Sequence, residues 1–425
     1  GGWIWKQDAR GNPWMSVACQ GLGASVWYPC KDTQSDEPDD GASLHITVAD
    51  SLQAIGNGRL RDVVKNADGT STWNWKVTDP INTYNLVPYI GKYAHFGEQF
   101  AGGEGALDCD YWVLAYNEAK AREQFKQVAE MLKCFEGWFG PYPFYKDSYK
   151  LVESPHLGME HQSAVAYGNR YMNGYLGSDL SGTGHGLKWD FIIIHESGHE
   201  WFGNSITTAD IADMWVHEGI TQYSEALFTE CQQGVEAGAD YVIGLRKKIE
   251  NKKPVIGPYG VNQEGPGDMY PKGANLMHMI RHIIGDSTFK AMMLEMNKRF
   301  FHKVTSSAEV EKFISEFSGT DFKLADKIVY SKIRKNIGGN FDIVVSGAAS
   351  LQPRIASFFS AIGMPVYEGY GLTETSPVVA VSCRDKNGRE SGTVGFPLPG
   401  VEVKIAENGE VCCRGHNVMM GYYKD

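Results

Sequence analysis

The pattern of apolar and polar positions changes twice along the chain. Up to about residue 106 it alternates over short segments, as in ADGTSTWNWKV, where Trp73, Trp75 and Val77 are separated by polar residues. Such alternation is typical of half-buried strands. Turn-forming groups such as GNG at 56–58 interrupt it. We therefore expect residues 1–106 to form an antiparallel β-sheet domain.

Residues 107–322 show a mostly helical pattern after a mixed beginning. YWVLAY and YKLVES are strand-like, and between them apolar residues at helical spacing predict a single helix over Glu118–Phe139. The same spacing predicts helices in DFIIIHESGHEWFG, at 190–203, and in DMWVHEGITQYSEALFTE, at 213–230. This region is expected to be a second, mainly helical domain.

The last region, residues 323–425, alternates short strands with glycine-rich turns. FDIVVSGAAS, MPVYEGYGLTETSP, VEVKI and GEVCCRG all follow this pattern, which indicates a different kind of domain, of α/β type. The fold class predicted for the whole chain is multidomain α+β.

Length and composition are typical of a folded multidomain protein and argue against nucleic acid as its partner. A chain of 425 residues is longer than a single hydrophobic core usually accommodates, so two or three domains are expected. Its content of 42% hydrophobic and 21% charged residues is typical of globular proteins. The net charge of −11, without clustered Lys and Arg, argues against nucleic acid as a partner. No apolar run approaches the roughly 18–20 residues of a membrane span.

The cysteines and the first residues do not identify the cellular compartment of the protein. The eight cysteines form no C-x-x-C pair, which argues against a cysteine metal site. Cys19 and Cys30 are a candidate bridge in an oxidising compartment, but we expect free, buried thiols. The chain begins GGWIW, without Met or a signal-peptide pattern, so we expect the natural N-terminus to lie upstream. The localisation stays unknown.

The segment HESGH, inside the apolar helix pattern, carries the most specific chemistry. Helical spacing places His195 and His199 one turn apart on the same face, where two imidazole nitrogens can bind one zinc ion. Glu196 lies about 100° around the helix, beside the metal, where it can act as a base. The alternative is a chance pattern of two buried histidines that form ordinary hydrogen bonds.

A catalytic zinc site needs a third protein ligand, which the next predicted helix can supply. Glu218 follows His199 after eighteen residues, and an antiparallel helix pair brings its carboxylate back to the histidine face. His217 competes for this role, but it points away if Glu218 points inward. The sequence thus predicts one zinc per chain, held by His195, His199 and Glu218.

This segment and its surroundings resemble the M1 family of zinc aminopeptidases, which are gluzincins, over about residues 1–322. The resemblance rests on HESGH with Glu218, on the preceding GMEHQSA and on the following YPKGANLMHMIRHIIGD. It implies a thermolysin-like catalytic domain over 107–322, preceded by a partial β domain over 1–106. By the same resemblance, Glu196 activates the water that attacks the peptide.

Three further residues match positions that bind substrate or the transition state in that family. The family motif G-x-M-E-N corresponds to LGMEH here, which implies that Glu160 binds the free amine of a peptide; Leu157 and His161 depart from the motif. The motif Y-x-K-G implies that Tyr270 stabilises the transition state, with packing at a helix start as the alternative. Gln20 resembles a glutamine that lines the first substrate pocket.

Residues 323–425 resemble a different family, the adenylate-forming enzymes, and in particular long-chain acyl-CoA synthetases. The resemblance rests on SGAAS, YGLTET, GTVGFPLPG and GEVCCRG, and it implies that ATP and magnesium would contact Gly347, Ala348, Thr373 and Glu374. The family's preceding phosphate loop, its ribose-binding Asp and its C-terminal catalytic Lys have no counterpart. We therefore expect this fragment to lack adenylation activity.

The sequence predicts a zinc-dependent aminopeptidase that removes the first residue of peptides with a free N-terminus. The alternatives are an acyl-CoA synthetase fragment and an inactive chimera of two truncated genes joined near residue 322. We favour an assembly artefact over a genuine fusion at this join. Side-chain preference and oligomeric state are not predicted.

Overall fold

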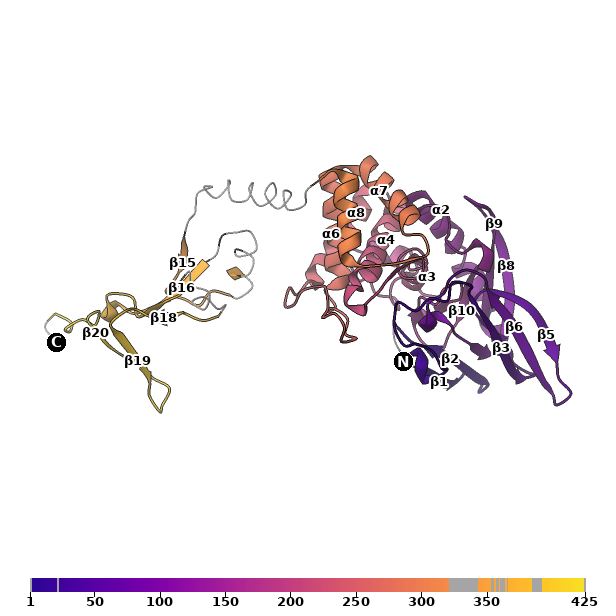
Figure 1. The fold of residues 1–425 in the computed structure, drawn as a ribbon, viewed down its shortest axis with the longest axis horizontal. Coiled ribbons are helices and arrows are strands. Elements are labelled where there is room, and N and C mark those ends of the chain that lie inside the picture. Colours follow the sequence, from indigo (N-terminus) through magenta and orange to yellow (C-terminus); the bar gives the residue numbers. More distant parts are fainter. Residues whose placement is uncertain are drawn as a thin grey trace. The chain divides into compact units, whose positions relative to one another are not determined.

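The structure is a computed structural model (Figure 1). It divides into two compact units, Gly1–Gly319 and Thr320–Asp425, which are described separately. The described residues are 2–20, 23–320, 343–352, 355–356, 359, 364, 366–383 and 392–423.

Two antiparallel sheets form the N-terminal part of the first unit. Their strands are β1 (Gly2–Gln7), β2 (Pro13–Ala18), β3 (Ala42–Ala49), β4 (Gln53–Ile55), β5 (Arg59–Lys65), β6 (Thr70–Val77) and β7 (Tyr89–Gly91). One sheet has the order β1-β2-β7-β4 and the other β3-β6-β5. The expected alternation lies in β6, where Trp75 is buried and its ring N–H donates to the Ala54 carbonyl. The predicted antiparallel sheet is confirmed.

A mixed five-stranded sheet follows and leads to the site. Its strands are β8 (Tyr93–Gly102), β9 (Gly105–Leu114), β10 (Tyr149–Glu153), β11 (Gly158–Met159) and β12 (Val165–Tyr167), in the order β11-β12-β10-β9-β8. β10 is parallel to both neighbours and buried along its whole length, as parallel strands usually are. The expected domain boundary at residue 106 falls within the β8–β9 hairpin. The sheet ends at β11, immediately before Glu160.

The helix predicted over Glu118–Phe139 is wrong as a single element. The structure has α1 (Glu118–Gln124) and α2 (Gln127–Phe139), with a turn at Phe125 and Lys126. The turn places the Phe125 ring among the aromatic rings of Tyr111 and Tyr167, with centroids 5.3 and 4.9 Å away. Burial of this large ring in an aromatic cluster outweighs continuation of the helix.

Helices form most of the rest of the first unit (Figure 1), together with a parallel pair of short strands, β13 (Ile206–Thr208) and β14 (Lys303–Thr305). The helices are α3 (Phe191–Gly198), α4 (Trp215–Gln233), α5 (Val235–Gly244), α6 (Met269–Ile284), α7 (Asp286–Arg299) and α8 (Ser307–Ser318). α4 packs closely against α6, because Gly219 meets Gly273 with no side chain between them. A Cβ on Gly219 would lie 2.8 Å from the Gly273 Cα. This contact brings the start of α6 beside the start of α4.

A disulfide joins Cys134 in α2 to Cys231 in α4, which corrects the expectation of free thiols at these two positions. The two residues are separated by 97 positions, so their proximity depends on helix packing rather than on local spacing. Cys19 and Cys30, the candidate bridge, are both free. Among the described residues, no helix is long and apolar enough to cross a membrane.

The second unit contains short strands with turns between them. They are β15 (Val344–Ser346), β16 (Val366–Tyr370), β17 (Ala380–Val381), β18 (Phe396–Pro397), β19 (Val401–Ile405) and β20 (Val411–Gly415). β15 and β16 are parallel, and β19 pairs with β20 in an antiparallel hairpin. With the sheets and helices of the first unit, this confirms the multidomain α+β class.

Candidate active site

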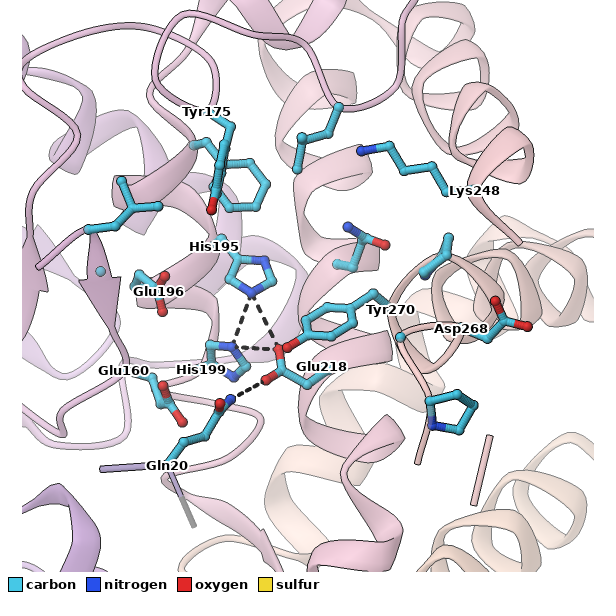
Figure 2. Close-up of a pocket in the computed structure, with 18 of the residues that line it drawn as sticks. Gln20, Glu160, Tyr175, His195, Glu196, His199, Glu218, Lys248, Asp268 and Tyr270 are labelled. Atoms are coloured by element: carbon cyan, nitrogen blue, oxygen red, sulfur yellow. Dashed lines mark hydrogen bonds and ion pairs between the residues drawn. The ribbon is translucent and has the colours of Figure 1, made fainter. Parts of the chain in front are cut away.

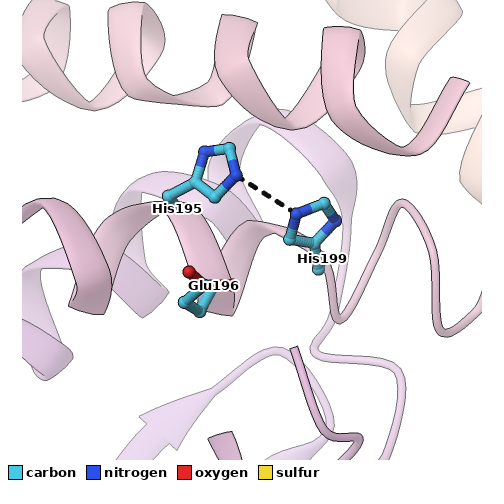
Figure 3. Close-up of side chains that lie close together, drawn as sticks. All are labelled: His195, Glu196 and His199. Carbon is cyan, nitrogen blue, oxygen red and sulfur yellow. Dashed lines mark hydrogen bonds between the residues drawn. The ribbon is translucent and has the colours of Figure 1, made fainter. Parts of the chain in front are cut away.

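Three side chains from two helices converge in the first unit (Figure 2), and Figure 3 shows the two histidines among them with Glu196. The Nε2 atoms of His195 and His199 lie 3.3 Å apart. Oε2 of Glu218, from α4, lies 3.4 Å from the first of these nitrogens and 3.2 Å from the second. All three side chains are buried. The sequence-predicted ligand set is therefore brought together.

Local sequence explains the position of each of the three groups. α3 begins at Asp190, whose carboxylate accepts the N–H groups of Ile192 and Ile193 as an N-cap. All eight residues of α3 are buried, and its first turn, Phe191–Ile194, is entirely apolar, which fixes the helix in the core. His195 lies within α3 and His199 at its C-cap, while Glu218 lies in the first turn of α4.

The three atoms fit a zinc ion by their chemistry and spacing. A triangle with sides of 3.2–3.4 Å has a point about 2 Å from all three corners, which is the length of zinc–nitrogen and zinc–oxygen bonds. Oε2 of Glu218 is buried and has no hydrogen-bond partner among the described residues, although buried polar atoms are usually partnered. A metal ion would satisfy this oxygen.

Both histidines are oriented by acceptors on their far side. Nδ1 of His195 lies 2.7 Å from Oε1 of Glu225, and Nδ1 of His199 lies 2.9 Å from the Phe202 carbonyl. Since a carboxylate and a carbonyl can only accept, each Nδ1 carries the proton and each Nε2 is free to bind a metal. Tyr241 donates to the other oxygen of Glu225 over 2.6 Å.

Glu225, which contacts His195, is a candidate functional residue that the sequence interpretation missed. It follows Glu218 by seven positions on α4, which is the spacing of one helix face. That spacing is the only signal for it in the sequence, and it becomes informative once Glu218 is assigned.

Replacing Glu225 with Gln is expected to weaken zinc binding by about 10- to 100-fold, the usual cost of losing the carboxylate behind a histidine ligand. Gln preserves the shape but removes the charge that makes the imidazole a stronger ligand. The measurement is the zinc dissociation constant from competition with a chromogenic chelator. Glu236→Gln, on the exposed surface of α5, is the control, and equal constants for the two variants would contradict the role of Glu225.

Glu196 faces the same cavity without hydrogen bonding to the histidines. One of its carboxylate oxygens lies within 4.8 Å of a ligand nitrogen of each histidine. Burial raises its pKa to about 7, even though the two histidines act in the opposite direction. Gly158 makes room for it, because a Cβ there would lie 2.7 Å from a Glu196 oxygen. A buried carboxyl with a pKa near neutrality is suited to proton transfer.

The remaining predicted residues line the same pocket, which has a volume of about 780 Å³. Glu160 is buried and accepts a hydrogen bond from the Tyr84 hydroxyl, and burial raises its pKa. Gln20 donates to the second oxygen of Glu218 over 2.7 Å. Burial and the negative charge of Glu218 raise the pKa of Tyr270, so its phenol stays protonated and can donate.

His217, the competing ligand, points elsewhere. Its Nε2 accepts the backbone N–H of Thr208 over 2.9 Å, and its Nδ1 lies 3.3 Å from Nε2 of Gln34. Burial lowers its pKa to about 3, so the ring is neutral. Glu218 is thus the member of this adjacent pair that faces the histidines.

The four candidate ATP-site residues lie in the second unit. Parallel pairing of β15 with β16 places Gly347 and the turn that holds Thr373 and Glu374 after the same ends of neighbouring strands. Gly347, Ala348 and Thr373 are exposed. Glu374 accepts a hydrogen bond from the Tyr422 hydroxyl over 2.8 Å, which lowers its pKa.

Two family models match the chain. The Peptidase family M1 domain matches residues 123–329, and the AMP-binding enzyme family matches residues 276–423. The matches overlap over 276–329, where the described residues up to 319 belong to the first unit.

Solved structures of other proteins share the fold of about three quarters of the chain. An M1 zinc metallopeptidase from Deinococcus radiodurans is 22% identical, with a TM-score of 0.61, and the alignment covers 74% of this chain and 67% of that one. Yeast leukotriene A4 hydrolase is 17% identical, with a TM-score of 0.60, over 76% of this chain and 52% of that one.

Curated relatives match about a quarter of the chain and are fatty-acid ligases. The long-chain-fatty-acid–CoA ligase FadD15 of Mycobacterium bovis is 45% identical over 100 residues, which are 24% of this chain and 16% of the ligase. Long chain acyl-CoA synthetase 4 of Arabidopsis thaliana is 38% identical over 115 residues, 17% of its length. The chain is therefore similar to the Peptidase family M1 domain over residues 123–329 and to AMP-binding enzymes over residues 276–423.

Proposed function

We propose that this chain is a zinc-dependent aminopeptidase. The observation that carries the proposal is the convergence of His195, His199 and Glu218 on one point, with Glu196 beside it in a large pocket. The catalytic domain would comprise residues 107–322, and residues 1–106 would contribute Gln20 to the pocket wall.

Each of the main groups in the pocket would have a separate role in the reaction. A bound zinc would act as a Lewis acid toward the peptide carbonyl and the attacking water. Glu196 would accept the proton of that water and then donate it to the departing amine. The Tyr270 hydroxyl would donate a hydrogen bond to the oxyanion that develops on the carbonyl.

Glu160 would set the register of the substrate. Its carboxylate lies in the pocket with the zinc ligands, where it can bind a protonated N-terminal amine. A fixed distance between this carboxylate and the metal places the first peptide bond at the reacting centre. Gln20, which contacts Glu218 and lines the pocket, would support the same end of the site.

The decisive test is hydrolysis of unblocked peptides by the purified chain. We expect release of the first amino acid, loss of activity with a zinc chelator and recovery on addition of zinc. Zinc content should be close to one per chain. Absence of amino-acid release from a broad panel of peptides, with zinc bound, would refute the function.

Glu160→Ala is expected to lower kcat/KM for peptides with a free amine by about 10- to 100-fold, the value of a hydrogen bond to a charged group. Residual cleavage of N-acetylated peptides should not change, because they carry no ammonium for the carboxylate to bind. Parallel assays of both substrate classes measure this difference, and Glu123→Ala, on the surface of α1, is the control. An equal loss for both classes would assign Glu160 a structural role instead.

The AMP-binding match raises a second function, which we do not favour for this chain. The matched segment covers only about a sixth of the ligases, and the residues that would contact ATP are largely exposed. We propose that residues 323–425 do not support adenylation. Fatty-acid-dependent exchange of pyrophosphate into ATP by the chain would overturn this view.

A further inference from the structure

The pocket has charged groups of opposite sign at its two ends. Figure 2 shows Glu160 and Lys248 on opposite sides of the zinc-ligand histidines. Lys252 and Lys253, four and five residues after Lys248 in the sequence, also line the pocket, as do the acidic Glu250 and Asp268. Figure 2 thus shows an acidic side chain, the candidate zinc ligands and a basic side chain, Lys248, in this order across the pocket.

The two ends differ in burial, which gives the pocket a direction. Glu160 is only 2% exposed, so the amine-binding end is closed. Lys248, Lys252 and Lys253 are exposed, so they form the rim. A peptide anchored by its amine at Glu160 would therefore extend past the zinc ligands toward these lysines. The rim lysines face the part of the substrate beyond the first residue.

The segment that carries the lysines is hydrogen-bonded to the start of α6, the helix that contains Tyr270. It comprises the 3-10 helix η7 (Leu245–Lys248) and the loop after it. The Asp268 carboxylate accepts the backbone N–H groups of Glu250 and Asn251 over 2.8 and 2.6 Å. Asp268 is the N-cap of α6 and lies two residues before Tyr270. These hydrogen bonds hold the lysine-bearing segment at a fixed position relative to Tyr270.

The charge on this rim is positive, although the chain as a whole carries −11. Lys252 is paired with Glu250 at 3.0 Å. In the ranges that the structure describes, Lys248 and Lys253 form no ion pair. Asp268 is 4% exposed, and its carboxylate is engaged by the loop backbone. Two lysine charges at the rim are therefore available to a ligand.

We propose that the site selects short peptides that carry a carboxylate just beyond the scissile bond, either their own C-terminus or an acidic side chain, and that Lys248 and Lys253 recognise it. This inference rests on the proposed aminopeptidase function. Each extended residue spans about 3.3–3.6 Å, so the C-terminal carboxylate of a dipeptide or tripeptide stays near the pocket. Longer neutral peptides place their terminus outside it.

The test compares a tripeptide with its C-terminal amide. We expect kcat/KM for Ala-Ala-Ala to exceed that for Ala-Ala-Ala-amide by about tenfold, since an exposed ion pair contributes up to about fivefold per lysine. The ratio should fall as salt is added, because exposed charges are screened. In the double variant Lys248→Gln, Lys253→Gln, it should drop to within about twofold.

Lys247→Gln is the matched control. Lys247 lies in the same 3-10 helix and is exposed, but it does not line the pocket. This variant should keep the wild-type ratio. Equal hydrolysis of acid and amide by the wild-type chain, or a ratio that the double variant leaves unchanged, overturns the rim proposal. Failure to hydrolyse Ala-Ala-Ala by a chain that releases amino acids from other peptides overturns the rim proposal alone. Absence of release from the whole panel of unblocked peptides overturns the aminopeptidase function, and this inference with it.

Discussion

Replacing Glu196 with Gln is expected to lower kcat by about 10²- to 10⁴-fold, the usual contribution of a general base. Gln has nearly the same shape as Glu, so its side chain fills the same buried position beside Gly158. Its amide can still hydrogen-bond to water but cannot accept a proton. Since Glu196 lies beside the ligand triangle and is not one of its corners, zinc content should stay close to one per chain.

Measurement of kcat and zinc content on the same samples separates loss of the base from loss of the metal. The control is Glu236→Gln, on the exposed surface of α5, which should match the parent chain in both. Near-normal kcat in Glu196→Gln would remove Glu196 from proton transfer. Low kcat accompanied by loss of zinc would instead indicate a role in metal binding.

The ligand set could be predicted from sequence because helix geometry is local. Residues four apart on a helix share a face whatever surrounds them, so His195 and His199 could be paired directly. Glu218 required one further assumption, an antiparallel helix pair, and its adjacent residue His217 was a real competitor. The structure shows Glu218 toward the histidines and His217 bonded to Thr208.

Features that depend on tertiary packing could not be predicted. The Cys134–Cys231 disulfide joins residues 97 positions apart, and nothing in their spacing indicates that α2 and α4 lie side by side. The turn at Phe125 breaks a continuous helical pattern because its ring packs with Tyr111 and Tyr167. Glu225 in α4 hydrogen-bonds to His195 in α3, and this contact can be recognised only once the two helices are packed together.

The two-part character of the chain could be predicted from short motifs. Matches to the Peptidase M1 and AMP-binding families confirm the two resemblances. The positions of Gly347, Thr373 and Glu374 near neighbouring strand ends depend on parallel pairing of β15 with β16. Strand pairing is long-range and had to come from the structure.

Replacing His195 with Ala is expected to reduce bound zinc from about one per chain to below about one tenth, and to abolish peptide hydrolysis, because two ligands rarely hold a catalytic zinc. The change also leaves the Glu225 carboxylate buried without its imidazole partner, which costs about 1–3 kcal/mol of stability. Thermal unfolding should therefore show a folded but less stable chain.

The metal measurement distinguishes a zinc site from two buried histidines that merely hydrogen-bond to each other and to Glu218. Zinc is determined after dialysis against a weak chelator, with His45→Ala as the control, since His45 is exposed on β3. His45→Ala should retain zinc and activity. Full zinc content in a folded His195→Ala chain would refute the ligand set, because the remaining pair, His199 and Glu218, offers only two of the three converging atoms.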